Sequence, residues 1–433
     1  MILNLERHDR EIVAELAART TEALTNMRVR ALHDSTLVVD DDGLARTVLT
    51  AEILRLRASA ATGGRTSLLE DADLIDLAME QVFGLGRLQP LLNDPTVSDI
   101  HVRGSAPVWV KRRDGSKEML DPVVDSDQEL IQLIRHIATR HTNHERRFDG
   151  ANPELNIQLT DGSRVFAVMD VSARPSLVIR RHGFEISSLD ELVALGFLTN
   201  SAAAFLSAAV RSRHNIVIAG GTGSGKTTLL RALINEIPFD ERLITIEDAY
   251  ELGLDRFEDL HPDFDALQSR PANTEGAGEV DLLQLTRMAL RMDPDRVIVG
   301  EVRGAEAFPM LMAMSQGNNG SMCTIHADSA RGVIPKLAAY ISMANTGLPV
   351  STINMLISGS VHLVVHVESS PRGRRVSSIH EVIDVADSFV VTNSLFVINS
   401  NDELAVDYPM RRETLEALIK VGFDPRHVGV GVA

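Results

Sequence analysis

The feature that most restricts the fold of this chain is a glycine-rich run ending in a lysine and two threonines, Gly220-Gly221-Thr222-Gly223-Ser224-Gly225-Lys226-Thr227-Thr228. The apolar stretch Asn215–Ala219 before it predicts a strand, and the residues after it predict a helix. Glycines let successive backbone N–H groups point inward at the positive end of a helix, where they can surround phosphate oxygens. We therefore predict a phosphate-binding loop in which Lys226 bridges the outer phosphates and Thr227 binds Mg²⁺.

The chain around this loop has the pattern of an α/β domain. After about Gly183, short apolar segments alternate with longer helical ones, which is typical of a mostly parallel sheet covered by helices. The strands expected there are Asn215–Ala219, Arg242–Ile246, Arg296–Val299 and Ser321–Ile325. Strand-rich segments at Asp384–Asp387 and Ser388–Asn399 and a helix at Arg411–Val421 follow. We assign residues 184–433 to this P-loop domain.

The N-terminal part of the chain has a different pattern. Residues 67–183 mix helical and strand-like segments, with hairpin turns at Asp114-Gly115 and Asp161-Gly162, and predict an α+β domain. Residues 1–66 predict a helical extension that ends in a linker at Ala61–Ser67. The sequence therefore predicts three parts.

Composition limits the class of protein. The chain has 433 residues, of which 44% are hydrophobic and 24% charged, as in a globular protein. Its formal net charge of −17 has the wrong sign for a protein that wraps nucleic acid. No stretch approaches the roughly 20 apolar residues that span a bilayer, the charged N-terminus leaves no room for a signal peptide, and the single cysteine cannot form an intramolecular disulfide. We expect a cytoplasmic protein.

Polar residues end the strands that should lie beside the phosphate loop. Glu247 follows the second strand and Glu301 the third, and carboxylates at this edge of a parallel sheet face the same crevice as the phosphates. Glu247 is a candidate general base or holder of a metal-bound water, and Glu301 can orient the attacking water or the hydrated Mg²⁺. His326 follows the fourth strand and could sense the terminal phosphate. Cys323 and His326 have metal-ligand spacing, but no second Cys/His pair accompanies them, so we do not expect zinc.

These residues together resemble the type II/IV secretion-system ATPases, which include VirB11-like traffic ATPases, with most likeness to the Tad-type (CpaF-like) pilus assembly branch. The phosphate loop matches the Walker A motif of the family. The other three family motifs, the Asp box, the Walker B motif and the His box, resemble Ile246–Leu252, Val297–Gly304 and Gly320–Ala327. The likeness to the Tad branch depends on Arg270–Gly276, Leu290–Arg296, Phe83–Leu88 and Val97–Ile100.

The resemblance implies a ring-shaped homohexamer that binds ATP and Mg²⁺ between a PAS-like N-terminal domain and a RecA-like C-terminal domain. It makes Glu247 and Glu301 the catalytic carboxylates and His326 the sensor. It also assigns Arg164 and Arg180 to the terminal phosphate, where an arginine fork would neutralise developing charge.

The chain departs from the family pattern in four places. Gln316–Asn319 replaces the Thr-Gly-His that usually precedes the His-box glycine, Phe166 replaces an asparagine, and Asp170-Val171 replaces paired prolines. Pro309 is expected to interrupt the helix predicted after Glu306.

The expected function is Mg²⁺-dependent ATP hydrolysis that drives pilus assembly or protein secretion. The partner would be an inner-membrane platform protein, through which alone the hexamer would associate with the cell membrane. One alternative is a RecA-like nucleic-acid motor, which the 4% aromatic content and the negative charge disfavour. The other is a non-catalytic nucleotide-binding scaffold ring, which Glu247 and Glu301 argue against.

Overall fold

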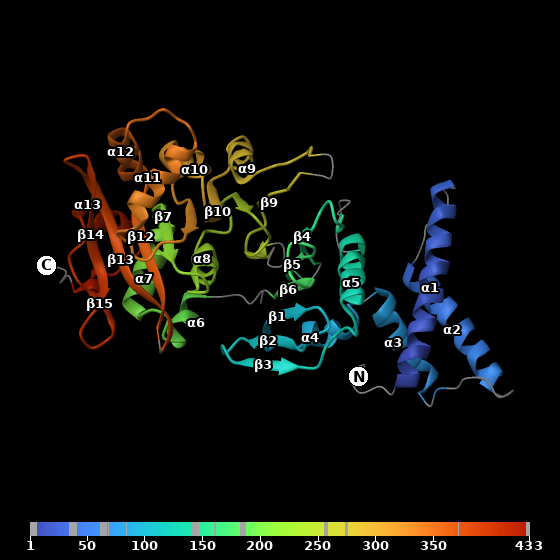
Figure 1. The fold of residues 1–433 in the computed structure, drawn as a ribbon. Helices are drawn as coiled ribbons and strands as arrows, with labels where there is room; N and C mark the ends of the chain where they lie inside the picture. The colour runs from blue at the N-terminus through green and yellow to red at the C-terminus, as the bar shows by residue number, and fades with distance from the viewer. Residues whose placement is uncertain are drawn as a thin grey trace. The chain divides into compact units, whose positions relative to one another are not determined.

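A computed structural model describes eleven ranges of the chain. These are residues 7–33, 41–60, 67, 69–83, 85–140, 147–159, 162–181, 188–254, 259–272, 276–370 and 372–429. The chain forms two compact units, Met1–Gly183 and Phe184–Ala433, each with hydrophobic cores of its own (Figure 1). The interior of the expected linker, Asp161 of the second expected hairpin turn, and Gly84, Asn273, Thr274 and Glu275 of the Tad-like motifs lie outside these ranges.

The first unit begins with three helices that share one core. They are α1 (Arg7–His33), α2 (Asp41–Ala60) and α3 (Asp71–Phe83). Their buried side chains include Leu16, Leu49 and Leu77. Helix α3, which follows the expected boundary at residue 66, therefore packs with the two helices that precede this boundary.

The rest of the first unit is built around an antiparallel sheet with the strand order β3-β2-β1-β6-β5-β4. The strands are β1 (Val97–Arg103), β2 (Val108–Arg112), β3 (Lys117–Leu120), β4 (Glu154–Gln158), β5 (Arg164–Val168) and β6 (Ser176–Arg180). The helical elements are η2 (Gly86–Leu88), α4 (Gln89–Asn93) and α5 (Asp127–Arg140). Leu130 and Ile134 of α5 are buried in the same core as Ile100 and Val165, so these strand residues lie on the face of the sheet that the helix covers.

The second unit contains a nine-stranded sheet in the order β15-β14-β13-β12-β7-β11-β10-β8-β9. The parallel strands are β7 (Ile216–Gly220), β8 (Leu243–Glu247), β9 (Phe264–Gln268), β10 (Arg296–Val302), β11 (Met322–Ile325) and β12 (Leu363–Ser370). An antiparallel extension consists of β13 (Gly373–Ala386), β14 (Phe389–Ile398) and β15 (Leu404–Val406). The helices are α6 (Leu189–Ala194), α7 (Asn200–Arg211), α8 (Lys226–Ile234), α9 (Leu282–Ala289), α10 (Ala307–Ser315), α11 (Val333–Met343), α12 (Val350–Ser360), α13 (Arg412–Lys420) and η4 (Pro425–Val428).

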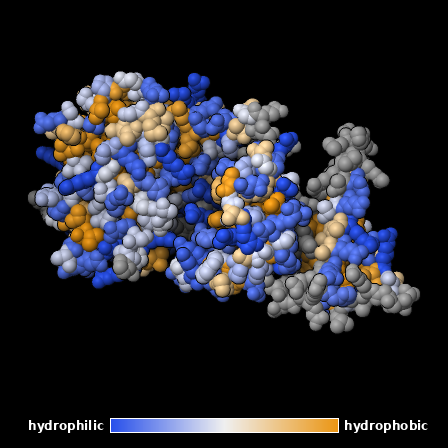
Figure 2. All heavy atoms as spheres, in the orientation of Figure 1, coloured by the Kyte–Doolittle hydropathy of each residue, from blue (hydrophilic) through white to orange (hydrophobic). Residues whose placement is uncertain are grey.

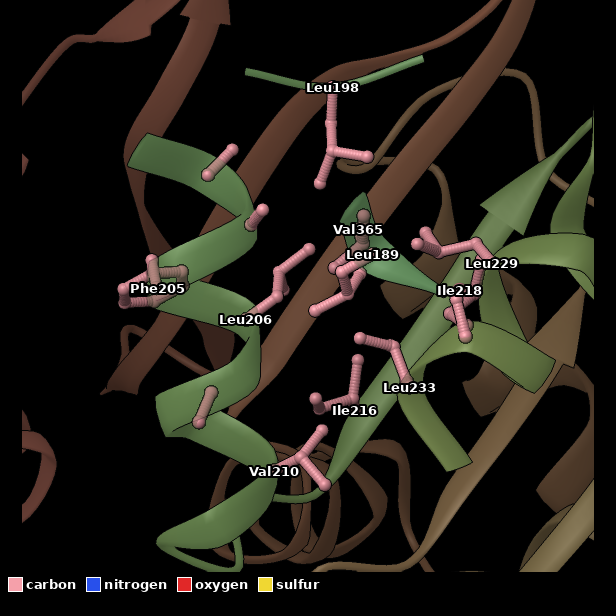
Figure 3. Close-up of a cluster of buried hydrophobic side chains, with 14 of the residues drawn as sticks. Leu189, Leu198, Phe205, Leu206, Val210, Ile216, Ile218, Leu229, Leu233 and Val365 are labelled. Atoms are coloured by element: carbon pink, nitrogen blue, oxygen red, sulfur yellow. The ribbon is translucent and has the colours of Figure 1, made fainter. Parts of the chain in front are cut away.

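The central strand β7 is apolar throughout because both of its faces are covered. Ile216 and Ile218 join one core with residues of α7 and α8, as Figure 3 shows. Val217 and Ala219 point into a second core, which includes residues of α10 and α11. A strand that is buried on both faces has a continuous run of apolar residues, and such a run can be recognised in the sequence.

The expected α/β fold class is confirmed, and the four expected strands of the second unit begin and end within three residues of the predicted positions. Pro309 does not interrupt a helix, because α10 begins at Ala307 and proline is tolerated in a first turn. Within the described ranges, no helix has both the length and the apolar composition that crossing a bilayer requires. On the face drawn in Figure 2, hydrophilic residues predominate and hydrophobic ones form separate groups.

Candidate functional site

The glycine-rich run forms a tight loop between β7 and α8. Gly225 caps the start of α8 with φ of 100°, a left-handed conformation that favours glycine. A methyl group on Gly225 would lie 2.8 Å from Phe197 Cε2, and one on Gly220 would lie 2.3 Å from the carbonyl oxygen of Val367. The close packing of the loop against its neighbours therefore excludes larger residues at both positions.

Lys226 lies inside this loop and is 8% exposed. Its Nζ donates hydrogen bonds to the carbonyl oxygens of Gly220 (3.0 Å) and Gly221 (2.8 Å). Burial lowers the pKa of Lys226, although the nearby charges of Glu301 and Glu251 oppose this shift. The loop thus holds a cation at the positive end of α8, where an anion would be stabilised.

The sheet order brings three of the predicted residues together. Strands β7, β11 and β10 are parallel neighbours, so the residues that follow them lie at one edge of the sheet. His326 Nδ1 lies 3.3 Å from Lys226 Nζ, and His326 Nε2 lies 2.6 Å from Glu301 Oε1. Because an ammonium group can only donate, Nδ1 accepts from Lys226 and the ring proton belongs on Nε2. Burial lowers the pKa of His326 despite the opposing effect of Glu301, which favours this neutral form.

Arg303 joins this group from the end of β10, although the sequence did not single it out as a site residue. Its Nε donates to Glu301 Oε2 at 2.7 Å, and its Nη1 donates to Asp248 Oδ2 at 3.1 Å. Burial opposes the charge of Arg303, but these carboxylates raise its pKa overall. Arg303 therefore links the Glu301 carboxylate, near the end of β10, to the loop after β8.

Glu247 lies at the predicted strand end, but its carboxylate has a structural role there. The side chain is 3% exposed, and Oε2 accepts hydrogen bonds from the backbone N–H groups of Glu251 (2.7 Å) and Leu252 (2.8 Å). These bonds fix the turn that follows β8. Glu247 therefore orders this turn, and its catalytic role stays a prediction.

Glu251 is a second acidic residue beside the phosphate loop, and the sequence did not single it out. Thr227 Oγ1 donates to Glu251 Oε2 at 3.4 Å, which places the carboxylate beside the predicted Mg²⁺ ligand. Strand ends alone could not show this, because Glu251 lies four residues beyond β8. The only signal in the sequence was that Glu251 lies with Glu247 in the Asp-box segment Ile246–Leu252.

The oxygen donors near Thr227 fit Mg²⁺. Mg²⁺ prefers oxygen ligands and is usually held by one or two carboxylates, water and substrate phosphates. The Thr227 hydroxyl and the Glu251 carboxylate supply such oxygens. The described part of the chain contains no group of three or more His, Cys, Asp or Glu residues that could hold a metal by themselves, so the phosphates would have to complete the site.

Arg164 and Arg180 belong to the first unit and pair with each other across β5 and β6. Arg180 Nε also donates to Asp99 Oδ1 at 3.1 Å. The structure thus places the two arginines side by side on one sheet. Their role toward the terminal phosphate stays a prediction.

The altered His-box segment keeps a dense hydrogen-bond network. Asn215, fully buried before β7, donates to the carbonyl oxygens of Met314 (2.9 Å) and Ser360 (2.6 Å). Its Oδ1 accepts from the backbone N–H of Gly320 at 2.8 Å. The Asn318 side chain donates to the Pro294 carbonyl oxygen. These asparagines hold the segment before β11 without the family's histidine.

Cys323 is fully buried within β11, and burial raises the pKa of its thiol. A thiol in this environment stays protonated and packs as a small apolar residue.

Comparisons with known proteins identify the family of this chain. A family model described as "Type II/IV secretion system protein" matches residues 84–382. The type IV secretion system protein VirB11 of Brucella suis is 30% identical over 72% of this chain and 93% of its own length. The conjugal transfer protein TrbB of Rhizobium radiobacter is 28% identical over 72% of this chain and 92% of its own length. The X-ray structure of the ATPase DotB from Yersinia pseudotuberculosis matches with a TM-score of 0.50 and 16% identity, covering 71% of this chain and 80% of that one. This last likeness concerns the fold alone, and it supports the RecA-like P-loop fold expected from the sequence.

Proposed function

Since this chain belongs to the type II/IV secretion system protein family and is an ATPase, we propose that it hydrolyses Mg²⁺-bound ATP to drive pilus assembly or protein secretion. The observation that carries the site assignment is the chain of contacts from Lys226 through His326 to Glu301. It joins the loop that binds phosphate to a carboxylate that can act on water, as phosphoryl transfer requires.

We propose a role in ATP hydrolysis for each residue around the phosphate loop. Lys226 and the backbone N–H groups of the loop hold the outer phosphates, and Glu301 orients the attacking water. His326 is neutral and carries its proton on Nε2. It contacts both Lys226 and Glu301 and so fixes the distance between them. Bound Mg²⁺ would neutralise charge on the phosphate oxygens, held by Thr227 and Glu251.

We propose Glu251, in place of Glu247, as the second carboxylate of the reaction. The Oε2 atom of Glu247 already accepts two backbone hydrogen bonds, whereas the carboxylate of Glu251 faces the Thr227 hydroxyl. Glu247 would then act through the turn that positions Glu251.

The oligomeric state and the place of action in the cell are also part of the proposed function. We infer a homohexamer of the Tad-type branch that works at the cytoplasmic face of the inner membrane and pushes on a platform protein there. The sequence motifs shared with that branch support this inference. A six-membered ring in electron micrographs of the purified protein would test the assembly.

Lys226→Ala tests the site assignment. Because Lys226 is the cation of the loop, the variant should lose ATP turnover, measured as phosphate release. Lys420→Ala changes an exposed lysine of α13 and should leave turnover intact. Turnover by Lys226→Ala at the wild-type rate would show that the site is assigned wrongly.

Stimulation of ATP turnover of the wild-type protein by single-stranded DNA or RNA would favour a nucleic-acid motor over a secretion motor.

A further inference from the structure

The hairpin between β12 and β13 lies directly against the phosphate loop. Val367 of β12 is the register partner of Gly220, and its carbonyl oxygen leaves no room for a side chain there. The hairpin returns through Gly373 into β13, where the backbone N–H of Val376 donates to the carbonyl oxygen of Phe197 at 2.7 Å. A methyl group on Gly225 would lie 2.8 Å from Phe197 and 3.7 Å from Arg374 Cδ. Arg374 therefore lies at the start of α8.

Three arginines of this hairpin differ in their ion pairs. Arg375 is bound to Glu368 and Asp402, and Arg372 pairs with Asp402 at 3.0 Å. Arg374, in contrast, has no carboxylate within ion-pair distance among the residues that the structure describes, and its side chain is exposed. The aliphatic part of the Arg374 side chain lies beside Gly225 of the phosphate loop, and its guanidinium group is available to bind a ligand.

The sheet order shows which part of a bound nucleotide Arg374 can reach. Glu301 lies near the end of β10, and His326 and Glu251 follow β11 and β8. These three strands lie on one side of β7. Arg374 belongs to β13, which lies on the other side of β7, beyond β12. The terminal phosphate must face the residues that act on water, so the opposite end of the nucleotide, with its ribose and base, extends toward the hairpin.

We propose that Arg374 binds the adenine base of the nucleotide by stacking its guanidinium plane on the ring. A guanidinium group is planar, weakly hydrated and well suited to stacking on aromatic faces. The contact would be the same in the bound substrate and in the transition state, so it would strengthen binding without changing the chemical step. The inference rests on the proposed use of ATP by the loop.

Titration of the full-length protein with two ligands tests this contact. One ligand is Mg²⁺-bound ATP and the other is inorganic tripolyphosphate, which has the phosphates but no base. Arg374→Ala should weaken ATP binding roughly 5- to 30-fold and leave tripolyphosphate binding unchanged. It should raise KM for ATP with kcat kept. Arg372→Ala, a change of an exposed arginine in the same hairpin, should match the wild type with both ligands.

The possible outcomes separate this inference from the proposed function. Equal losses for ATP and tripolyphosphate in Arg374→Ala would show a phosphate contact and overturn base stacking. Unchanged ATP binding in this variant would overturn it as well. If the wild-type protein bound neither ligand, both the proposed function and the inference would be wrong.

Discussion

At the scale of single residues, Glu247 and Glu251 show how one carboxylate can position another. Glu247 is buried and accepts hydrogen bonds from two backbone N–H groups, one of which belongs to Glu251. The side chain of Glu251 reaches Thr227. Burying a carboxylate is costly unless it is hydrogen-bonded, and Glu247 meets this condition through the turn that it orders.

The same substitution at both positions separates the two roles. Glu251→Gln should reduce kcat by about 10²- to 10⁴-fold with little change in stability, since it removes a charge from the reacting site. Glu247→Gln should instead lower the free energy of unfolding by about 1–3 kcal/mol, because a neutral amide oxygen accepts backbone hydrogen bonds less strongly than a carboxylate does. Phosphate release and urea denaturation measure the two effects. A larger loss of kcat in Glu247→Gln, without loss of stability, would restore Glu247 as the catalytic group.

The positions of polar residues after apolar segments predicted part of this site. Lys226, Glu301 and His326 were predicted because each follows a buried strand that reads clearly in the sequence, and the structure brings them together. Glu251 and Arg303 could not be placed in this way. Their positions depend on the conformation of a turn and on a contact between residues 55 apart, for which apolar periodicity carries no signal.

At the scale of elements, two histidines lie where β7 and β12 begin, at the end opposite the phosphate loop. His214 and His362 precede these strands, and their ring centroids lie 5.3 Å apart. His362 Nδ1 accepts the backbone N–H of Asn215 at 2.8 Å. Burial lowers the pKa of each ring to about 4, and the charge of Arg411 adds to this effect. Both rings are therefore neutral in the folded protein near pH 7.

This pair predicts a loss of stability in acid. In the unfolded chain a histidine has a pKa of about 6.5, so between about pH 6.5 and 4 the unfolded state binds more protons than the folded state. Stability is complete above this window and is lost as the pH falls through it. From pH 7 to pH 5 we expect a loss of about 2 kcal/mol for each ring, measured by urea denaturation. His214→Gln should reduce this pH dependence, whereas a change of the exposed His101 to Gln should not. The same dependence in His214→Gln and in the wild type would contradict the prediction.

Most helices and strands could be predicted from the sequence, but the elements against which they pack could not. Helix α3 was expected in the α+β domain, yet Leu74 and Leu77 pack against α1 and α2. An apolar helical face shows that a partner exists but does not identify it, because several cores in one chain can accept the same side chains. Strand β7, by contrast, was clear because a strand buried on both faces must be apolar throughout.

At the scale of the whole molecule, the two compact units have separate cores. Leu130 is buried in the sheet core of the first unit and Leu233 in a core of the second, and both are fully shielded from solvent. Chains built from several cores often unfold in more than one step. A ligand that binds one folded unit stabilises that unit in proportion to the logarithm of its concentration.

We therefore expect at least two unfolding transitions, assigned by one substitution in each unit. Leu130→Ala and Leu233→Ala should each destabilise one unit by about 2–5 kcal/mol and shift a different transition in calorimetry. Mg²⁺-bound ATP should raise the transition that Leu233→Ala lowers, because the phosphate loop belongs to that unit, and at 100 times Kd the gain should be about 2.7 kcal/mol. Lys226→Ala should remove this gain. If Arg164 and Arg180 also bind the terminal phosphate, replacing both with alanine should reduce the gain as well. A single transition that both leucine variants lower equally would show that the two units fold as one.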